Sequence, residues 1–179
     1  MTVIRQSVPP EVFRDMMAGV CAPVTVVTTT EDGGPIGATV SSFASLSLDP
    51  PLVSVAFDRG SRALKAILET RRFGVNLLGS AQADLARLFA TRDIDRFAQA
   101  DWHLEEGLPR LDGAAGWIEC DLYEAVEGGD HILLLGHVVG ASRAELPPLV
   151  YAYRTFGTHS NYAQRQRPTI IDSIAALSS

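Results

Sequence analysis

Val24 to Thr30, VTVVTTT, is the stretch of this 179-residue chain that decides its fold class. Every residue in it is β-branched, and β-branched side chains favour the extended backbone of a strand. The next residues, Glu31 to Gly34 (EDGG), end in two glycines, which supply the positive φ angles of a tight hairpin turn. The chain is then predicted to return as a second strand from Ile36 to about Phe43. The stretch therefore predicts an antiparallel hairpin.

Similar strands recur along the chain, with few helices between them. We expect further strands at Leu52–Phe57, Phe73–Leu78, Trp117–Val126, His131–Ala141 and Leu149–Arg154, with a second hairpin turn at Glu127–Asp130. Apolar residues at helical spacing predict helices over Glu11–Val20, from Arg62 to about Arg71 after a Ser61 cap, and from a Ser80 cap to about Thr91. Residues 92–112 are polar and irregular, which predicts a long loop with one helical turn.

These elements predict one mainly β domain. Strands joined by glycine-containing hairpins favour an antiparallel sheet that closes into a barrel. The alternating βαβ units of a doubly wound parallel sheet are missing from the pattern. The length suits one domain, and the sequence contains no internal repeat or linker. We expect a single domain over residues 1–179, with its core from about residue 12 to 157 and a polar, helix-prone tail from 158 to 179.

Composition narrows the range of partners. The chain carries 15 basic and 21 acidic side chains, a formal net charge of −6, and 46% of its residues are hydrophobic. An acidic protein lacks the basic surface that binds phosphate backbones or anionic membranes, so we expect neither nucleic acid nor membrane as a partner. The first residues lack the apolar core of a secretory signal, and no window reaches the roughly 18 apolar residues of a membrane span. We therefore expect a cytoplasmic protein that acts on small molecules.

The cysteines and histidines form no metal-binding pattern. Cys21 and Cys120 are far apart in the sequence, and the spacings H-E-x-x-H and C-x-x-C do not occur. We therefore expect no metal site, and we expect both cysteines, which apolar residues flank, to be buried structural thiols. The Walker motif and the G-x-S-x-G motif are absent, and the absence of G-x-G-x-x-G disfavours a Rossmann-type nicotinamide enzyme.

Two stretches combine glycine with polar side chains in a way that suits a ligand. Gly37–Phe43 (GATVSSF) places three hydroxyls on a strand, either against a polar ligand that the glycine lets approach or on a solvated strand face. Asp58–Arg62 (DRGSR) joins a strand end to a helix start. Its backbone N–H groups, helix dipole and arginines suit an anion, and the following helix is locally basic. The alternative is a capped surface helix with a solvated basic face.

Two single residues are also candidates for a site. Asn76 lies in the apolar strand FGVNLL and must satisfy its amide through neighbouring backbone or through a ligand. His131 follows the second turn in Gly129-Asp130-His131, where it approaches a cofactor, acts as an acid, or faces solvent.

Taken in order, these stretches resemble the flavin reductase family, the small FMN-binding split barrels that supply reduced flavin to partner monooxygenases. The matching segments are PVTVVTT (23–29), DGGPIGATVSSF (32–43), SLSLDPPLV (45–53), Ser61-Arg62, RFGVNLL (72–78) and GDH (129–131). The resemblance covers roughly residues 12–157 and implies a homodimer of split β-barrels with one flavin, FMN or FAD, for each subunit.

The resemblance also implies roles for individual residues. Those expected to bind the flavin are Thr39, Val40, Ser41 and Ser42 at the ring and ribityl chain, Ser45 and Ser47 nearby, Ser61 and Arg62 at the phosphate, and Asn76 in support. His131 is implied as the catalytic residue, facing the incoming nicotinamide of NADH or NADPH. The implied activity is an NAD(P)H:flavin oxidoreductase, and the implied partner is a flavin-dependent monooxygenase.

Two other functions stay open on the same barrel. A flavin-dependent oxidase of the pyridoxamine phosphate type needs a further basic pocket, for which Arg154, Arg165 and Arg167 are the candidates. A flavin- or haem-binding protein without catalytic activity would bind its cofactor and oxidise no nicotinamide.

Overall fold

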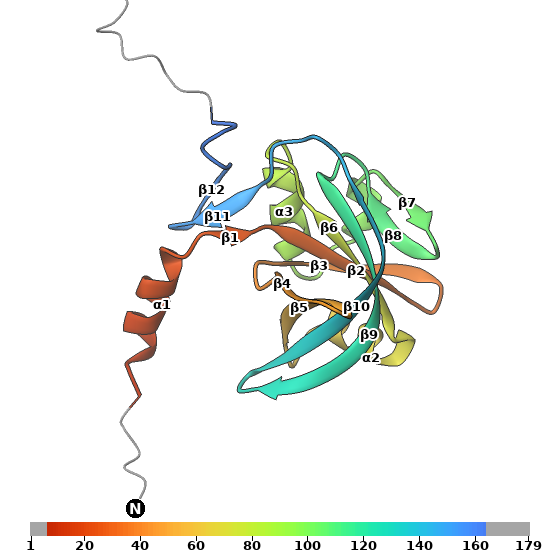
Figure 1. Cartoon of the computed structure of the whole chain (residues 1–179), viewed down its shortest axis with the longest axis horizontal. Helices are drawn as coiled ribbons and strands as arrows, with labels where there is room; N and C mark the ends of the chain where they lie inside the picture. Colours follow the sequence, from red (N-terminus) through yellow and green to blue (C-terminus); the bar gives the residue numbers. More distant parts are fainter. Residues whose placement is uncertain (1–6, 164–179) are drawn as a thin grey trace, which may run out of the picture.

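The computed structural model of the chain describes residues 7–163 (Figure 1). Its helices are α1 (Pro10–Ala18), α2 (Arg62–Thr70) and α3 (Ala83–Ala90), with a short 3-10 turn at Phe97–Gln99. Its strands are β1 (Ala22–Pro23), β2 (Thr25–Glu31), β3 (Gly34–Val40), β4 (Ala44–Leu48), β5 (Pro51–Asp58), β6 (Arg72–Leu77), β7 (Trp102–Glu105), β8 (Leu108–Leu111), β9 (Gly116–Gly128), β10 (His131–Arg143), β11 (Val150–Ala152) and β12 (Thr155–Gly157). The predicted mainly β fold is confirmed.

The main sheet is antiparallel and has seven strands in the order β3-β2-β6-β9-β10-β5-β4. The predicted first hairpin is confirmed, since Thr25 lies opposite Val40 and Glu31 opposite Gly34. The predicted closure into a barrel is wrong for the described residues, because β3 and β4 are both edge strands. Between them the Ser42 hydroxyl accepts a hydrogen bond from the Ala56 N–H and donates one to its carbonyl, at 2.9 and 3.0 Å. A side chain therefore links the segment after β3 to β5, and no strand pairing joins β3 to β4 among the described residues.

The core consists of two apolar clusters on the main sheet. The larger one packs α2, through Ala63, Leu64, Ala66 and Ile67, against buried residues of the sheet such as Val55 and Phe73. The smaller one lies under α3, where the Phe97 ring meets Phe89 and Trp102 edge-on at 5.0 and 5.2 Å. Apolar burial of this kind is the main favourable term in folding, and it fixes both helices on the sheet.

Gly74 on β6 lets the sheet pack closely, because a Cβ there would lie 1.9 Å from the Trp117 ring. Such a contact is far inside van der Waals distance, so only glycine fits this position.

Residues 92–112 contain the predicted helical turn, at Phe97–Gln99, but they differ otherwise from the predicted loop. They contain the β7–β8 hairpin, whose turn places Glu106 and Gly107 at positive φ, 50° and 80°. The strands are only four residues long, and their buried positions do not alternate. The hydrophobic pattern of these strands is therefore too short and too irregular to predict a hairpin from the sequence.

Three smaller predictions are also wrong. Helix α3 is capped at Gln82 and not at Ser80, and the Gln82 side chain bonds the Gly79 N–H and the Asp112 carbonyl. The predicted last strand is a small hairpin, β11–β12, with Tyr153 and Arg154 at positive φ in its turn. Cys21 is exposed, whereas Cys120 is buried as expected. The tail beyond residue 163 lies outside the described residues, so the single-domain assignment stays a prediction.

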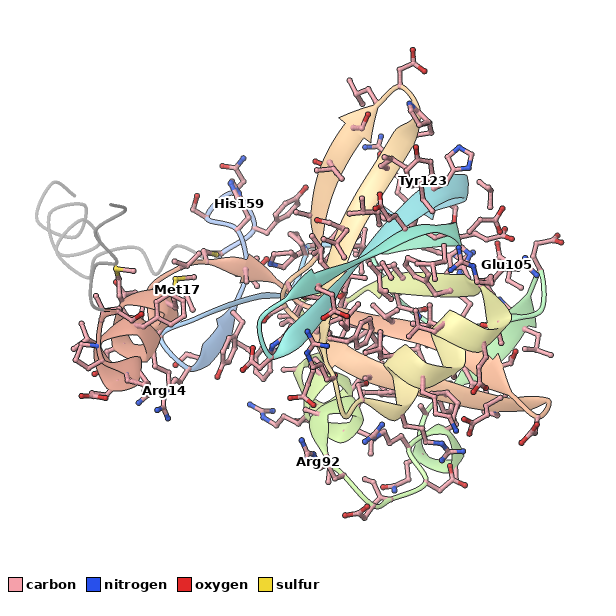
Figure 2. All side chains as sticks on the ribbon, turned by 90° about the horizontal axis from the view of Figure 1, so that it is seen from below. Arg14, Met17, Arg92, Glu105, Tyr123 and His159 are labelled. Atoms are coloured by element: carbon pink, nitrogen blue, oxygen red, sulfur yellow. The ribbon has the colours of Figure 1, made fainter. Side chains whose placement is uncertain are left out.

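Helix α1 projects from the body of the protein and has no buried residue (Figure 1). Figure 2 shows Arg14 and Met17 on this helix, away from the main sheet. It leads into β1, which pairs with β11 in the small sheet β1-β11-β12. Among the described residues, none of the helices is long and apolar enough to cross a membrane.

Candidate functional site

A groove of about 870 Å³ collects most of the predicted chemistry and is here called the Ser61 groove. It is bounded by β3, by the end of β5, by the start of α2, by the end of α3 with the loop that follows it, and by His131 at the start of β10. Five of the ten predicted site residues line it, namely Thr39, Val40, Ser61, Arg62 and His131. Residues that are far apart in the sequence therefore meet in one hollow.

The start of α2 forms one wall of this groove. The Ser61 hydroxyl caps the helix and accepts a hydrogen bond from the Leu64 N–H at 3.4 Å. The preceding turn is fixed by Asp58, whose carboxylate accepts from the Gly60 N–H at 2.7 Å. A helix start presents unpaired N–H groups and the positive end of the helix dipole. The turn thus points a positive backbone surface into the groove.

The basic residues of α2 and of the start of β6 are less available than the sequence indicated. Arg62 donates to Glu31 at 2.6 Å, and the Glu31 side chain is only 19% exposed. Lys65 lies 3.9 Å from Glu69, and Arg72 pairs with Glu119 at 2.5 Å. Glu69 of α2 itself, together with Glu31 and Glu119 from other elements, therefore offsets the expected local positive charge. Of these bases only Arg62 lines the groove.

His131 lies opposite Asp58 at the edge of the Ser61 groove. Its Nδ1 is 2.7 Å from the Asp130 carboxylate, which orients the ring and leaves Nε2 on the other side. The hydrogen bond from His131 lowers the pKa of the Asp130 carboxyl below its usual range. The sequence singled out this pair, and the structure makes it one oriented unit.

The hydroxyls of β3 and of the link to β4 serve mainly as scaffold. Thr39 Oγ1 donates to the Ala86 carbonyl of α3 at 2.7 Å, and Ser42 bridges to Ala56 as described above. Ser45 and Ser47 lie on edge strand β4 and line neither of the two grooves described here. The hydroxyls of Thr39 and Ser42 are therefore used within the fold.

Asn76 is fully buried in β6 and lies outside both grooves. Its amide nitrogen donates to the Val26 carbonyl at 3.1 Å, and its Oδ1 accepts from the Leu111 N–H at 2.7 Å. Of the two alternatives left open above, the structure shows the backbone one. Asn76 ties β2, β6 and β8 together beneath the site.

The loop Arg92–Phe97 was missed as part of the site. It lines the Ser61 groove opposite α2, and Arg96 donates to the Gly37 carbonyl of β3 at 2.7 Å. The loop brings two arginines and two aspartates to the groove. The signal that could have found it is the run of alternating charges, TRDIDRF, directly after an amphipathic helix.

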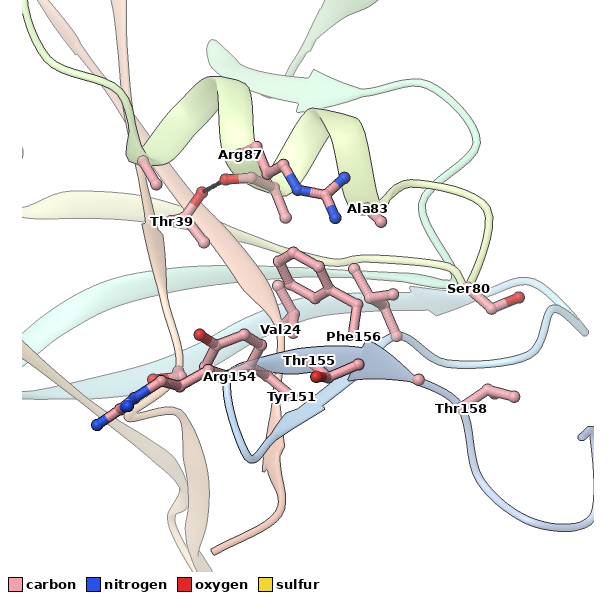
Figure 3. Close-up of a pocket in the computed structure, with 15 residues that line it drawn as sticks. Val24, Thr39, Ser80, Ala83, Arg87, Tyr151, Arg154, Thr155, Phe156 and Thr158 are labelled. Carbon is pink, nitrogen blue, oxygen red and sulfur yellow. Dashed lines mark hydrogen bonds between the residues drawn. The ribbon is translucent and has the colours of Figure 1, made fainter. Parts of the chain in front are cut away.

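A second hollow, about 930 Å³ in volume, lies on the other side of Thr39 (Figure 3). We call it the Phe156 groove. Its walls are α3 and the β11–β12 hairpin, and it contains Ser41 of the predicted site. The two grooves share Thr39 and Ala90.

Within residues 7–163, no cluster of three or more His, Cys, Asp or Glu side chains is placed to hold a metal ion.

The family of the chain follows from its similarity to known proteins. The family described as "Flavin reductase like domain" matches residues 17–160. The chain is 39% identical over 145 residues to a "Probable flavin reductase" of Rhizobium meliloti, covering 80% of this chain and 47% of that protein. It is 38% identical over 141 residues to the reductase subunit HsaB of a flavin-dependent monooxygenase of Mycobacterium tuberculosis, covering 78% of this chain and 74% of HsaB.

A solved structure agrees. The NADH:FAD oxidoreductase SgcE6 of Streptomyces globisporus, crystallised with NAD and FAD fragments, superposes with a TM-score of 0.82. The two sequences are 31% identical, over 89% of this chain and all of SgcE6. The chain therefore belongs to the flavin reductase-like family, and the resemblance found in the sequence is confirmed. The protein class is that of the flavin reductases, which are oxidoreductases.

Proposed function

We propose that this protein transfers a hydride from NADH or NADPH to FMN or FAD in the Ser61 groove. The observation that carries the proposal is the meeting of an anion-binding helix start, an edge strand and an oriented His–Asp pair in one hollow. Its volume lies within the range typical of small-molecule and cofactor sites.

The residues of the groove fit a flavin. The start of α2, with Ser61 and Arg62, provides donors for the phosphate. Edge strand β3 leaves alternate backbone N–H and C=O groups without a strand partner, and these suit the polar edge of an isoalloxazine ring. Arg96 already bonds the Gly37 carbonyl on this edge, which supports β3 as the wall that faces the groove.

When bound, the flavin accepts the hydride and carries the reducing equivalents. The work of the protein is then to hold two rings in contact, and good alignment alone is worth up to about 7–11 kcal/mol of the barrier. Backbone donors on β3 would stabilise negative charge that develops on the ring. His131, held by Asp130, would position the nicotinamide at the open side of the groove.

We further propose that the protein is a homodimer. Large apolar side chains of α1 and β4 are exposed, including Phe13 at 53%, Met16 at 66% and Leu48 at 95%. A nine-residue helix without a covering surface is marginal in water, so contact with a second copy would stabilise α1. Sedimentation equilibrium tests this, and a monomer at micromolar concentration would contradict it.

The proposed partner is a flavin-dependent monooxygenase that receives the reduced flavin. HsaB, named above as a monooxygenase reductase subunit, supports this assignment. We place the protein in the cytoplasm, where reduced nicotinamide nucleotides are available and free thiols such as Cys21 persist.

The decisive experiment mixes the purified protein with NADH or NADPH and with FMN or FAD, and follows the absorbance of the reduced nicotinamide. We expect oxidation well above the rate with free flavin alone. Tight flavin binding without nicotinamide oxidation would favour the non-catalytic alternative. Of the arginines that an oxidase of the pyridoxamine phosphate type would need, Arg154 lies in the Phe156 groove, while Arg165 and Arg167 lie outside the described residues.

A further inference from the structure

Arg96 brings to the Ser61 groove a positive charge that the proposed function does not yet use. The residue lies on the loop after α3, is half-buried and lines the groove. Its Nε donates to the Thr91 carbonyl and its Nη1 to the Gly37 carbonyl of β3, both at 2.7 Å. These two bonds hold the guanidinium between the end of α3 and edge strand β3.

The charge of Arg96 has no carboxylate partner. Arg62, which also lines the groove, pairs with Glu31, but none of the ion pairs among the described residues includes Arg96. The carboxylate of the neighbouring Asp95 instead accepts from the Ala98 N–H at 3.1 Å. An arginine stays charged in a protein, and withdrawing a charge from water without a partner is unfavourable. A negatively charged ligand group in the groove would compensate this charge.

The strand that Arg96 holds is fixed at several points. Thr39 Oγ1 donates to a backbone carbonyl of α3 at 2.7 Å, two residues along β3 from the Gly37 contact. A Cβ at Gly37 would lie 2.9 Å from the Phe89 ring and 3.1 Å from the Phe97 ring, so the backbone packs directly on these side chains. The guanidinium and the edge of β3 therefore form one preorganised surface. A preorganised charge needs no rearrangement when the charge of a ligand changes.

A flavin in this groove changes its charge in the proposed reaction. The transferred hydride consists of two electrons and one proton, so the ring gains one negative charge while NADH or NADPH becomes NAD⁺ or NADP⁺. A fixed cation beside the ring therefore binds the reduced form more tightly than the oxidised form. The flavin phosphate takes no part in the hydride transfer, and we place it at the start of α2, on the opposite wall.

We propose that Arg96 raises the reduction potential of the bound flavin, because its positive charge faces the pyrimidine edge of the isoalloxazine ring. Two of its N–H groups hold the protein backbone, and the remaining donors of the guanidinium make no hydrogen bond among the described residues. These donors can bond the carbonyl oxygens and ring nitrogens of that edge. The proposal rests on the proposed function, in which the ring lies along β3.

The test is the midpoint potential of FMN bound to Arg96→Gln, measured by dithionite reduction beside a reference dye and without nicotinamide. Glutamine keeps a hydrogen-bond donor and removes the charge. We expect reduced FMN to lose about tenfold or more affinity relative to oxidised FMN. For a two-electron couple this lowers the potential by about 30 mV or more.

Lys65→Gln is the matched control, because it removes one positive charge from an exposed side chain that lines neither groove. Its potential should equal that of the unmodified protein. A potential of Arg96→Gln that equals that of the unmodified protein would overturn the proposal.

Arg96→Lys separates the charge from the grip on β3. Lysine keeps the positive charge, but its single nitrogen cannot reproduce the planar fork that bonds two carbonyls. We expect its potential to lie closer to that of the unmodified protein than to that of Arg96→Gln. If Arg96→Lys lowers the potential as far as Arg96→Gln does, the hydrogen bonds and not the charge are responsible, and the proposal is overturned.

Riboflavin, which has the ring but no phosphate, distinguishes the two parts of the ligand. If Arg96 faces the ring, Arg96→Gln lowers the potential of bound riboflavin and of bound FMN by the same amount. If Arg96 faces the phosphate, the variant weakens the binding of oxidised FMN, spares riboflavin and leaves both potentials unchanged. That second result would overturn the proposal.

These potentials are independent of the oxidation assay. If the potential depends on Arg96 but no nicotinamide is oxidised, the proposed function fails and the role of Arg96 stands. If nicotinamide is oxidised and the potential does not depend on Arg96, the function stands and the role of Arg96 is wrong. Absence of flavin binding to the unmodified protein would overturn both.

Discussion

Asn76 and Ser61 are both polar residues that the sequence placed at a flavin, yet the structure puts them in opposite settings. Asn76 is fully buried, and its amide bonds the backbone of two other strands. Ser61 lies at a helix start on the wall of a groove. Asn76 therefore finds all its partners within the fold, whereas Ser61 lines the groove in which we propose that the flavin binds. The comparison separates a residue that stabilises the fold from one with a proposed role in binding.

The two cysteines provide the largest contrast between interior and surface. Cys120 is buried, and burial together with Asp121 and Glu119 raises the pKa of its thiol to about 12. Cys21 is exposed. Because thiol reagents attack the thiolate, we expect Cys120 to react more than about a thousand times more slowly than Cys21 at pH 8.

A disulfide reagent followed by absorbance checks this. It should titrate one thiol per chain rapidly and the second only after denaturation. Cys21→Ser should abolish the rapid phase and leave the slow one. Rapid reaction of both thiols in the native protein would show that the sheet around Cys120 opens easily, and the contrast would fail.

Replacing Asn76 by alanine tests the interior side of the comparison. The change leaves the Leu111 N–H and the Val26 carbonyl buried without their partner. We expect the free energy of unfolding to fall by about 3 kcal/mol, as measured by chemical denaturation. The matched control is Asn161→Ala at an exposed position, which we expect to change stability by less than about 0.5 kcal/mol. A loss of flavin affinity at unchanged stability would instead assign Asn76 to the site.

Replacing Ser61 by aspartate tests the groove side. Aspartate is as good a helix cap as serine, so the stability of α2 is expected to be kept. Its negative charge would face the flavin phosphate, and we expect the dissociation constant for FMN to rise about tenfold or more in a fluorescence titration. Ser61→Asn, an equally good cap without charge, is the control and should bind FMN nearly as well as the unmodified protein. Equal affinity in all three proteins would refute the phosphate site.

The main sheet was predictable because its signals are local. VTVVTTT followed by two glycines specifies a hairpin within a dozen or so residues, and β2–β3 forms as expected. The β7–β8 hairpin was not predictable, because its strands are four residues long and its side chains pack on elements far away in sequence. Closure of the sheet was mispredicted for a similar reason. It depends on whether edge strands β3 and β4 pair with each other, which no local pattern encodes.

The candidate site also has features that were predictable from local sequence and features that were not. The capped helix start at Ser61 and the Asp130-His131 pair are contiguous in sequence, so their chemistry is visible there. The partners of Asn76 and Arg62 are not contiguous with them. Leu111 and Glu31 come close to these residues only through the fold. The Leu111 N–H bonds the amide oxygen of Asn76, and the Glu31 carboxylate pairs with the guanidinium of Arg62. Arg87 and Arg154 are likewise far apart in the sequence and line the same groove only through the fold.

The smallest expected effect is a shift in the titration of Asp130, which tests the surface side of the comparison between interior and surface groups. The hydrogen bond from His131 lowers the pKa of the fully exposed Asp130 carboxyl, with the charge of the ring as a second cause. A carboxyl whose pKa is lowered on folding adds stability above its unfolded pKa, and that stability is lost as the pH falls through the folded value. We therefore expect His131→Ala to move the Asp130 titration to higher pH, as followed by the carboxyl carbon shift in NMR. His103→Ala, which removes the comparable contact with Asp112, is the control and should leave Asp130 unchanged.

The effect of ionic strength distinguishes the exposed Asp130–His131 pair from the buried polar groups. Exposed charges are screened, so the difference between His131→Ala and the unmodified protein should shrink as the ionic strength rises. The cost of Asn76→Ala should not, because no ion reaches the amide in the core. If the Asp130 titration were the same with and without His131, the ring would not be held by the carboxylate. His131 would then reach the nicotinamide without a fixed orientation, and its proposed positioning role would lose its structural basis.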